Sequence, residues 1–151
     1  MQHPLITRLA NSTSLITPIR FAPAVAAYAA ILARMGSPES GLRILISLAV
    51  LGCSIALLKL MTRKTRPNGE VPHGLSLGAF PSGHSAFAWF LVPVLLYTLP
   101  APYALPAASI AAGSAVLIGA ARIHIRCHTL TQVLVGALVG LLVPTLVFVV
   151  A

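Results

Sequence analysis

A short polar cluster, Pro81-Ser82-Gly83-His84-Ser85, comes directly before an apolar run and is therefore expected to open a helix. A helix start offers free backbone N–H groups and the positive end of the helix dipole, which together favour a bound anion. Gly83 would let an anion approach the backbone closely, and the Ser82 hydroxyl would add a donor, so this cluster could cradle a phosphate. His84 at its edge could protonate a leaving oxygen. The alternative is that Ser82 only caps the helix and His84 is an incidental interfacial residue.

A second polar cluster runs from Arg122 to Gln132 and opens the last apolar run. His128 and Gln132 are four residues apart, so on a helix the amide oxygen of Gln132 could accept a hydrogen bond from one ring nitrogen of His128. The other ring nitrogen would face a substrate, and an oriented imidazole is a competent nucleophile toward phosphorus. Two alternatives stay open: His124 and His128 could simply lie at a membrane interface, or they could form an H-x-x-x-H zinc pair.

Carboxylates are too scarce in this chain for most metal and phosphatase chemistries. Glu39 and Glu70 are its two acidic residues, and an H-E-x-x-H motif is absent, so we expect no metal and no other cofactor. Aspartyl-phosphate and two-metal mechanisms need Asp, which the sequence lacks. A cysteine nucleophile in a C-x5-R loop would need Arg at the positions where the chain has Lys59 and Val133.

A third cluster lies at the end of an earlier apolar run and contains Lys59, Arg63 and Arg66. Their spacing of i, i+4 and i+7 would place them on one helical face if the helix continued that far. Pro67 disfavours the α conformation for Arg66, which is therefore expected to turn from the helix end into the loop. The alternative is an ordinary positively charged helix end whose side chains reach the lipid headgroups.

The elements that must position these clusters are membrane helices. Of the 151 residues, 58% are hydrophobic and 8% are charged, which excludes a soluble enzyme. Ten Lys and Arg residues against two acidic residues give a net charge of +8, which implies an anionic partner. The cations lie at the ends of apolar runs, so a membrane lipid or a phosphorylated small molecule fits better than nucleic acid, which we do not expect as a partner.

The hydropathy pattern predicts an all-α integral-membrane helical bundle of about five transmembrane helices with an N-terminal interfacial segment. The five uncharged runs are 21–33, 44–58, 85–99, 103–121 and 129–151. A span needs about 20 residues, and short runs lengthen when their polar flanks are included. One example is 38–63, with Ser37 as N-cap and Pro38 at the first helical position.

We expect a single membrane-embedded domain over 1–151, in which 1–20 is the interfacial segment and 21–151 the bundle. Five crossings would put the loops at 60–82 and 121–128 on the same side, where the three clusters meet. Gly136 and Gly140 form a G-x-x-x-G pair, which favours close helix packing inside the bundle, with a dimer face as the alternative.

In order, the motifs K-x6-R-P, P-S-G-H and R-x5-H resemble the three-part signature of the type 2 phosphatidic acid phosphatase superfamily. The resemblance covers 59–132, about half of the chain. It implies that the phosphate-binding residues are Lys59, Arg66, Ser82, Gly83 and Arg122. It further implies that His128 is the nucleophile that forms a phosphohistidine, that His84 is the general acid for the leaving group, and that no metal takes part.

Two residues depart from the usual form of the third motif, S-R-x5-H-x3-D. Ala121 replaces the Ser, and Gln132 replaces the Asp. A neutral amide can orient the imidazole but cannot stabilise its cationic form as a carboxylate does, so we expect a less activated nucleophile. The segment from His128 to Val133 is similar to that of dolichyl diphosphate phosphatases of the same superfamily, in which Gln occupies this place. This similarity favours a polyprenyl diphosphate as substrate.

The sequence thus predicts a metal-independent enzyme that hydrolyses a phosphomonoester or diphosphate of a long-chain membrane lipid. The alternatives are a lipid phosphotransferase that uses the same phosphohistidine and a non-catalytic protein that binds anionic lipid. The positive-inside rule, applied to the cations that have no assigned catalytic role, would place the active site on the cytoplasmic face. The resemblance instead implies a multi-pass protein of the cell membrane with its active site on the external face, and we adopt that expectation.

Overall fold

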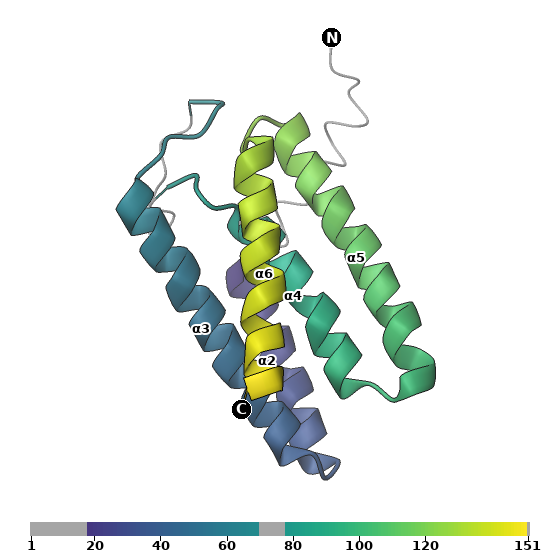
Figure 1. The fold of residues 1–151 in the computed structure, drawn as a ribbon. Helices are drawn as coiled ribbons and strands as arrows, with labels where there is room; N and C mark the ends of the chain where they lie inside the picture. The colour runs from purple at the N-terminus through teal and green to yellow at the C-terminus, as the bar shows by residue number, and fades with distance from the viewer. Residues whose placement is uncertain (1–17, 70–77, 151) are drawn as a thin grey trace.

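The computed structural model describes residues 18–69 and 78–150, and all regular structure within those ranges is α-helical. The helices are α2 (Pro18–Arg34), α3 (Pro38–Thr62), α4 (Gly83–Thr98), α5 (Ala101–His124) and α6 (Leu130–Val150). They form an elongated bundle (Figure 1). The five predicted apolar runs are therefore confirmed as five helices. The interfacial segment expected at 1–20 lies outside the described residues, except for its last three residues, which begin α2.

Three of the helices, α3, α5 and α6, are long and apolar enough to cross a bilayer, with hydropathies of 2.4, 1.7 and 2.8. The apolar helices α2 and α4 are shorter. With 16 residues, α4 rises about 24 Å, less than the roughly 30 Å of a bilayer core. Local thinning of the bilayer can accommodate such a mismatch. The predicted integral-membrane helical bundle is confirmed.

The central helix is α4, which packs chiefly against α5 and α6 and also contacts α2 and α3. Its Phe90 and Val94 are fully buried, together with Ile44 and Leu51 of α3. The surrounding helices expose large apolar side chains such as Leu117, which is 71% exposed. In a membrane such a surface faces the lipid chains, so the bundle buries its core around α4 and presents apolar side chains outward.

Two glycines of α6 allow its backbone to touch that of α4. A Cβ atom at Gly136 would collide with the carbonyl oxygen of Ser82, and one at Gly140 would collide with the carbonyl oxygen of Ala86. The G-x-x-x-G pair therefore packs within the bundle, as predicted. The starts of the two helices are also in contact. There the Ser82 N–H donates to the carbonyl oxygen of Gln132 at 2.9 Å.

The start of α3 agrees only in part with the sequence prediction. Pro38 occupies the first helical position, as expected, and Ser37 occupies the N-cap position. The Ser37 side chain, however, makes no capping hydrogen bond. Its backbone angles, φ −121° and ψ 58°, lie outside the extended region that a capping residue normally adopts.

The end of α3 differs from the predicted boundary at Arg63. Arg63 adopts a left-handed conformation with φ 42°, and its N–H donates to the carbonyl oxygen of Lys59 at 3.0 Å. This geometry ends the helix at Thr62. The shared helical face considered for Lys59, Arg63 and Arg66 therefore does not form, and Arg66 lies in the loop, as the following proline led us to expect.

The α3–α4 and α5–α6 connections lie at one end of the bundle, and the α2–α3 and α4–α5 connections lie at the other (Figure 1). This arrangement is the predicted topology. The three polar clusters are thereby brought to the same end of the molecule, although they are distant in sequence.

Candidate active site

His128 lies in the loop between α5 and α6 and is only 6% exposed. Its Nδ1 lies 2.9 Å from the carbonyl oxygen of Ala79 and 3.2 Å from Oε1 of Gln132. A backbone carbonyl can only accept a hydrogen bond, so Nδ1 must carry the proton. In the neutral imidazole Nε2 then has a free lone pair, which is the form that a nucleophile requires.

The amide of Gln132 is held in one orientation by the start of α6. Its Oε1 accepts the backbone N–H of Thr129 at 3.0 Å, and its own backbone N–H donates to Oγ1 of Thr129 at 3.4 Å. These reciprocal bonds form a capping box at the first turn of the helix. The Thr129 N–H needs an acceptor, so the atom of the Gln132 amide that lies beside it must be the oxygen. The same oxygen also faces His128 Nδ1. The Gln132 oxygen accordingly orients the ring, as its spacing from His128 predicted.

The environment of His128 keeps its imidazole neutral. Burial is the main cause that lowers the pKa of His128 from 6.5 to about 4, against the opposing hydrogen bonds to Gln132 and Ala79. The positive charges of Lys59 and Arg66 lower this pKa further. At neutral pH the ring is thus uncharged, and the lone pair on Nε2 is available.

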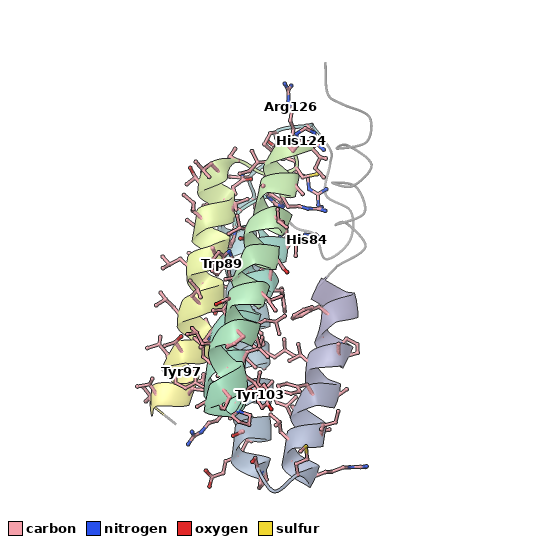
Figure 2. All side chains as sticks on the ribbon, turned by 90° about the vertical axis from the view of Figure 1, so that its right-hand side faces the viewer. His84, Trp89, Tyr97, Tyr103, His124 and Arg126 are labelled. Atoms are coloured by element: carbon pink, nitrogen blue, oxygen red, sulfur yellow. The ribbon has the colours of Figure 1, made fainter. Side chains whose placement is uncertain are left out.

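The three clusters meet around His84, near the start of α4. The charges of Lys59, Arg66, Arg122 and His128 all act on the His84 ring, so these side chains lie at the same end of the bundle as His84. The Nε2 atom of His84 is buried and has no hydrogen-bond partner among residues 18–69 and 78–150. Figure 2 shows that His84 lies farther from the end of the molecule than His124 and Arg126 do.

Lys59 also fixes the loop that carries Ala79. Its Nζ donates to the carbonyl oxygen of Gly78 at 2.8 Å, and the Ala79 N–H donates to the carbonyl oxygen of Lys64 at 2.8 Å. Thr62 Oγ1 lies within hydrogen-bonding distance of the Phe80 carbonyl oxygen, at 3.1 Å. The end of α3 therefore positions the backbone carbonyl that contacts the His128 ring.

Ser82 takes the helix-capping role that the sequence left open. It is fully buried, and its Oγ accepts the backbone N–H of Ser85 at 3.4 Å. Ser85 Oγ in turn donates to the carbonyl oxygen of Val133 at 2.8 Å. A hydroxyl that accepts one hydrogen bond still has its own proton to donate, so the cap leaves Ser82 able to bind an anion.

The predicted phosphate-binding cations are close together, whereas other cations are not part of the cluster. Arg122 is 3% exposed, near the end of α5. Arg63, Lys64 and Arg126 are exposed, and Lys64 lies 5.3 Å above the Phe80 ring as a cation–π pair. Lys59 and Arg66 are half-buried, so the site contains buried and half-buried cations and is distinct from the solvent-facing ones.

The acidic residue within the described part of the chain is distant from these cations. Glu39 lies in the first turn of α3, at the opposite end of the bundle, and Glu70 lies outside the described residues. Nor do three or more His, Cys, Asp or Glu side chains gather anywhere in 18–69 or 78–150. A cluster of cations in this setting attracts a phosphate dianion, whose oxygens form charge-assisted hydrogen bonds with Arg and Lys.

Two contributors to the site were not found by sequence reasoning. The Ala79 carbonyl could not have been predicted, because every residue has a backbone oxygen and the residue type does not show which one will contact a side chain. Thr129 could have been found, because T-x-x-Q before an apolar run is the pattern of a capping box. Both act on the orientation of His128 rather than on a substrate.

The membrane bundle and its histidine and cation site fit an enzyme that acts on phosphorylated lipids. The family model of the PAP2 superfamily matches residues 40–151, and the chain belongs to that superfamily of membrane lipid phosphatases. The resemblance seen in the three motifs is confirmed. No curated protein matches the chain significantly by sequence.

Two solved structures have a similar fold. The first transmembrane PAP2 type phosphatidylglycerolphosphate phosphatase from Bacillus subtilis is 27% identical, with a TM-score of 0.83 over 97% of this chain and 77% of that chain. LpxE from Aquifex aeolicus is 22% identical, with a TM-score of 0.73 over 97% of this chain and 87% of that chain. The similarity to LpxE supports only the assignment of the fold.

Proposed function

We propose that this chain is a metal-independent hydrolase, working as one membrane-embedded domain, that removes phosphate from a long-chain lipid through a phosphohistidine on His128. The observation that carries the proposal is the pair of carbonyl contacts at His128 Nδ1, which leaves Nε2 as the nucleophile. A neutral, oriented imidazole near cations that can bind the phosphate oxygens is what attack on a phosphate requires.

In the first half of the reaction, the lone pair of His128 Nε2 attacks phosphorus, and the bond from phosphorus to the leaving oxygen breaks. Lys59, Arg66 and Arg122 bind the non-bridging oxygens and stabilise the charge that develops on them. The Ser82 hydroxyl and the Gly83 backbone N–H complete the cradle at the start of α4. His84 delivers a proton to the leaving oxygen.

In the second half, water attacks the phosphohistidine and His84 accepts a proton from that water. The bond between phosphorus and Nε2 breaks, which releases inorganic phosphate and restores the neutral ring. The Gln132 and Ala79 oxygens keep the proton on Nδ1 throughout, so the same nitrogen serves in every cycle.

Our preferred substrate is a polyprenyl diphosphate, on the strength of the similarity of the segment from His128 to Val133 to dolichyl diphosphate phosphatases. The Bacillus subtilis relative is named for phosphatidylglycerolphosphate, so a glycerolipid monoester is the competing substrate. Transfer to a lipid alcohol would use the same intermediate with a different acceptor. We place the protein in the cell membrane with its active site on the external face.

Release of phosphate in a chelator tests the proposal. Purified protein in detergent should release phosphate from a polyprenyl diphosphate without added metal, and His128→Ala should abolish release. His124→Ala is the matched control, because it removes a nearby histidine to which the mechanism gives no role, and it should retain most of the rate. The proposal fails if the wild type releases no more phosphate than His128→Ala from either a polyprenyl diphosphate or phosphatidic acid.

A further inference from the structure

An apolar cavity of about 210 Å³ lies between α2, α4 and α5 and begins at His84. Phe21 of α2 and Phe87 of α4 line it, and Ile118 of α5 lines it one turn before Arg122. The cavity therefore starts beside the proposed phosphate site, on the side where His84 would meet the leaving oxygen.

The cavity extends along the helices and away from that site. On α4 its wall runs from His84 to Leu91, and on the antiparallel α5 it runs from Ile118 back to Ala111. The two ends of each wall are seven positions apart, or about 10 Å at the rise of an α-helix. Leu91 and Ala111 thus lie at the end that is farthest from His84.

The lining selects an apolar occupant. Beyond His84, the polar side chain in the wall is Ser114, whose hydroxyl already donates to the carbonyl oxygen of Ile110 at 2.9 Å. A polar group placed in this cavity would lose its contacts with water without gaining a partner. A hydrocarbon chain makes no hydrogen bonds to water, so it would lose none on entering the cavity.

The volume limits how much hydrocarbon can enter. An apolar cavity of about 150 Å³ holds one benzene molecule of six carbons. By that measure, about 210 Å³ holds roughly eight or nine carbons. Spread over two helical turns, this volume accommodates one chain and excludes two chains that lie side by side.

We infer that this cavity holds the first carbons of a single hydrocarbon chain of the substrate, and that Ala111 determines how many carbons fit. This inference rests on the proposed function, because it places the leaving oxygen at His84. A larger side chain at Ala111 fills the end of the cavity far from His84 and leaves the phosphate site itself unchanged. Lipids with one chain next to the phosphate are then preferred over lipids with two.

The test compares Ala111→Leu with the wild type on two substrates that share a headgroup, geranyl diphosphate with ten carbons and isopentenyl diphosphate with five. We expect the ratio of kcat/KM for the longer over the shorter substrate to fall at least about tenfold in Ala111→Leu. Ala120→Leu makes the same change at an exposed position of α5 and should keep the wild-type ratio. Phosphatidic acid, with two chains, should be hydrolysed more slowly than geranyl diphosphate.

Binding is measured in parallel, as the rise in unfolding temperature that each diphosphate produces. If phosphate is released but Ala111→Leu keeps the wild-type ratio, or if phosphatidic acid is turned over as fast as geranyl diphosphate, the inference is wrong and the proposed function stands. If no phosphate is released, the proposed function fails, and the binding measurement alone tests the cavity assignment. The cavity assignment would then be supported if Ala111→Leu lost the rise in unfolding temperature with geranyl diphosphate but kept it with isopentenyl diphosphate. Rises in Ala111→Leu equal to those in the wild type would overturn the assignment.

Discussion

His128 and Ala79 are 49 residues apart in sequence, yet Nδ1 of the ring lies 2.9 Å from the Ala79 carbonyl oxygen. This contact joins the loop before α4 to the loop before α6. It also supplies an acceptor that no substitution at position 132 removes. The replacement of the family's usual Asp by Gln132 therefore leaves the tautomer of His128 fixed by two neutral oxygens.

Substitution of Gln132 by Leu should weaken the enzyme without inactivating it. The Ala79 carbonyl still holds the proton on Nδ1, so we expect about a tenfold loss of kcat. This is well short of the roughly 10⁴-fold loss seen when a catalytic histidine takes the wrong tautomer. Phosphate release under saturating substrate measures the effect.

The matched control for this substitution is Thr129→Val, which removes the capping Oγ1 but keeps the backbone N–H that holds Gln132 Oε1. It should cost about 1 kcal/mol of stability and little turnover. A Gln132→Leu variant as inactive as His128→Ala would show that the Ala79 contact does not orient the ring.

The titration of His128 should occur well below the usual range for histidine. Burial lowers its pKa to about 4, so an NMR titration of histidine-labelled protein in micelles should show this ring still neutral at pH 5.5. The unfolded chain would protonate the same group near 6.5, so it binds the additional proton between about pH 6.5 and 4. Stability should therefore decrease as the pH falls through that window. The resonance is assigned by its loss in His128→Ala, and a midpoint near 6.5 would contradict the buried, cation-flanked environment.

Substitution of Gly140 by Ala should destabilise the bundle. The added Cβ would collide with the Ala86 carbonyl oxygen, which is a backbone atom that cannot rotate away. We expect a loss of about 1–3 kcal/mol, measured as a lower unfolding temperature in detergent. Gly113→Ala is the control, because a Cβ there meets nothing within 4 Å, and it should be neutral or slightly stabilising. Equal unfolding temperatures for the two variants would argue against the close crossing of α4 and α6.

The sequence predicted the parts of this molecule that follow from hydropathy and short-range spacing. The five helices appear as uncharged runs, and the pairing of His128 with Gln132 follows from their separation of four residues. Close packing of Gly140 within the bundle was also predicted, because small residues four apart are typical of tight helix packing in membranes, but its partner helix was not.

What the sequence could not predict depends on backbone atoms and on packing between distant segments. Arg63 ends α3 in a left-handed conformation that its residue type does not favour. The Ala79 carbonyl reaches His128 from a loop that the Lys59 side chain and the Lys64 carbonyl oxygen hold against the end of α3. The cavity beside His84 needs three helices to form, so no single run contains a signal for it.

The central claim is that phosphate is transferred to Nε2 of His128, and the most direct measurement is to trap that intermediate. Wild-type protein mixed with excess polyprenyl diphosphate is quenched in alkaline denaturant, digested and analysed by mass spectrometry, with the ring nitrogen identified by NMR. We predict phosphate on Nε2 of His128 in the wild type and none in His128→Ala. An active wild-type enzyme that carries no phosphohistidine during turnover, or that carries phosphate on Nδ1 or on another residue, would contradict the account.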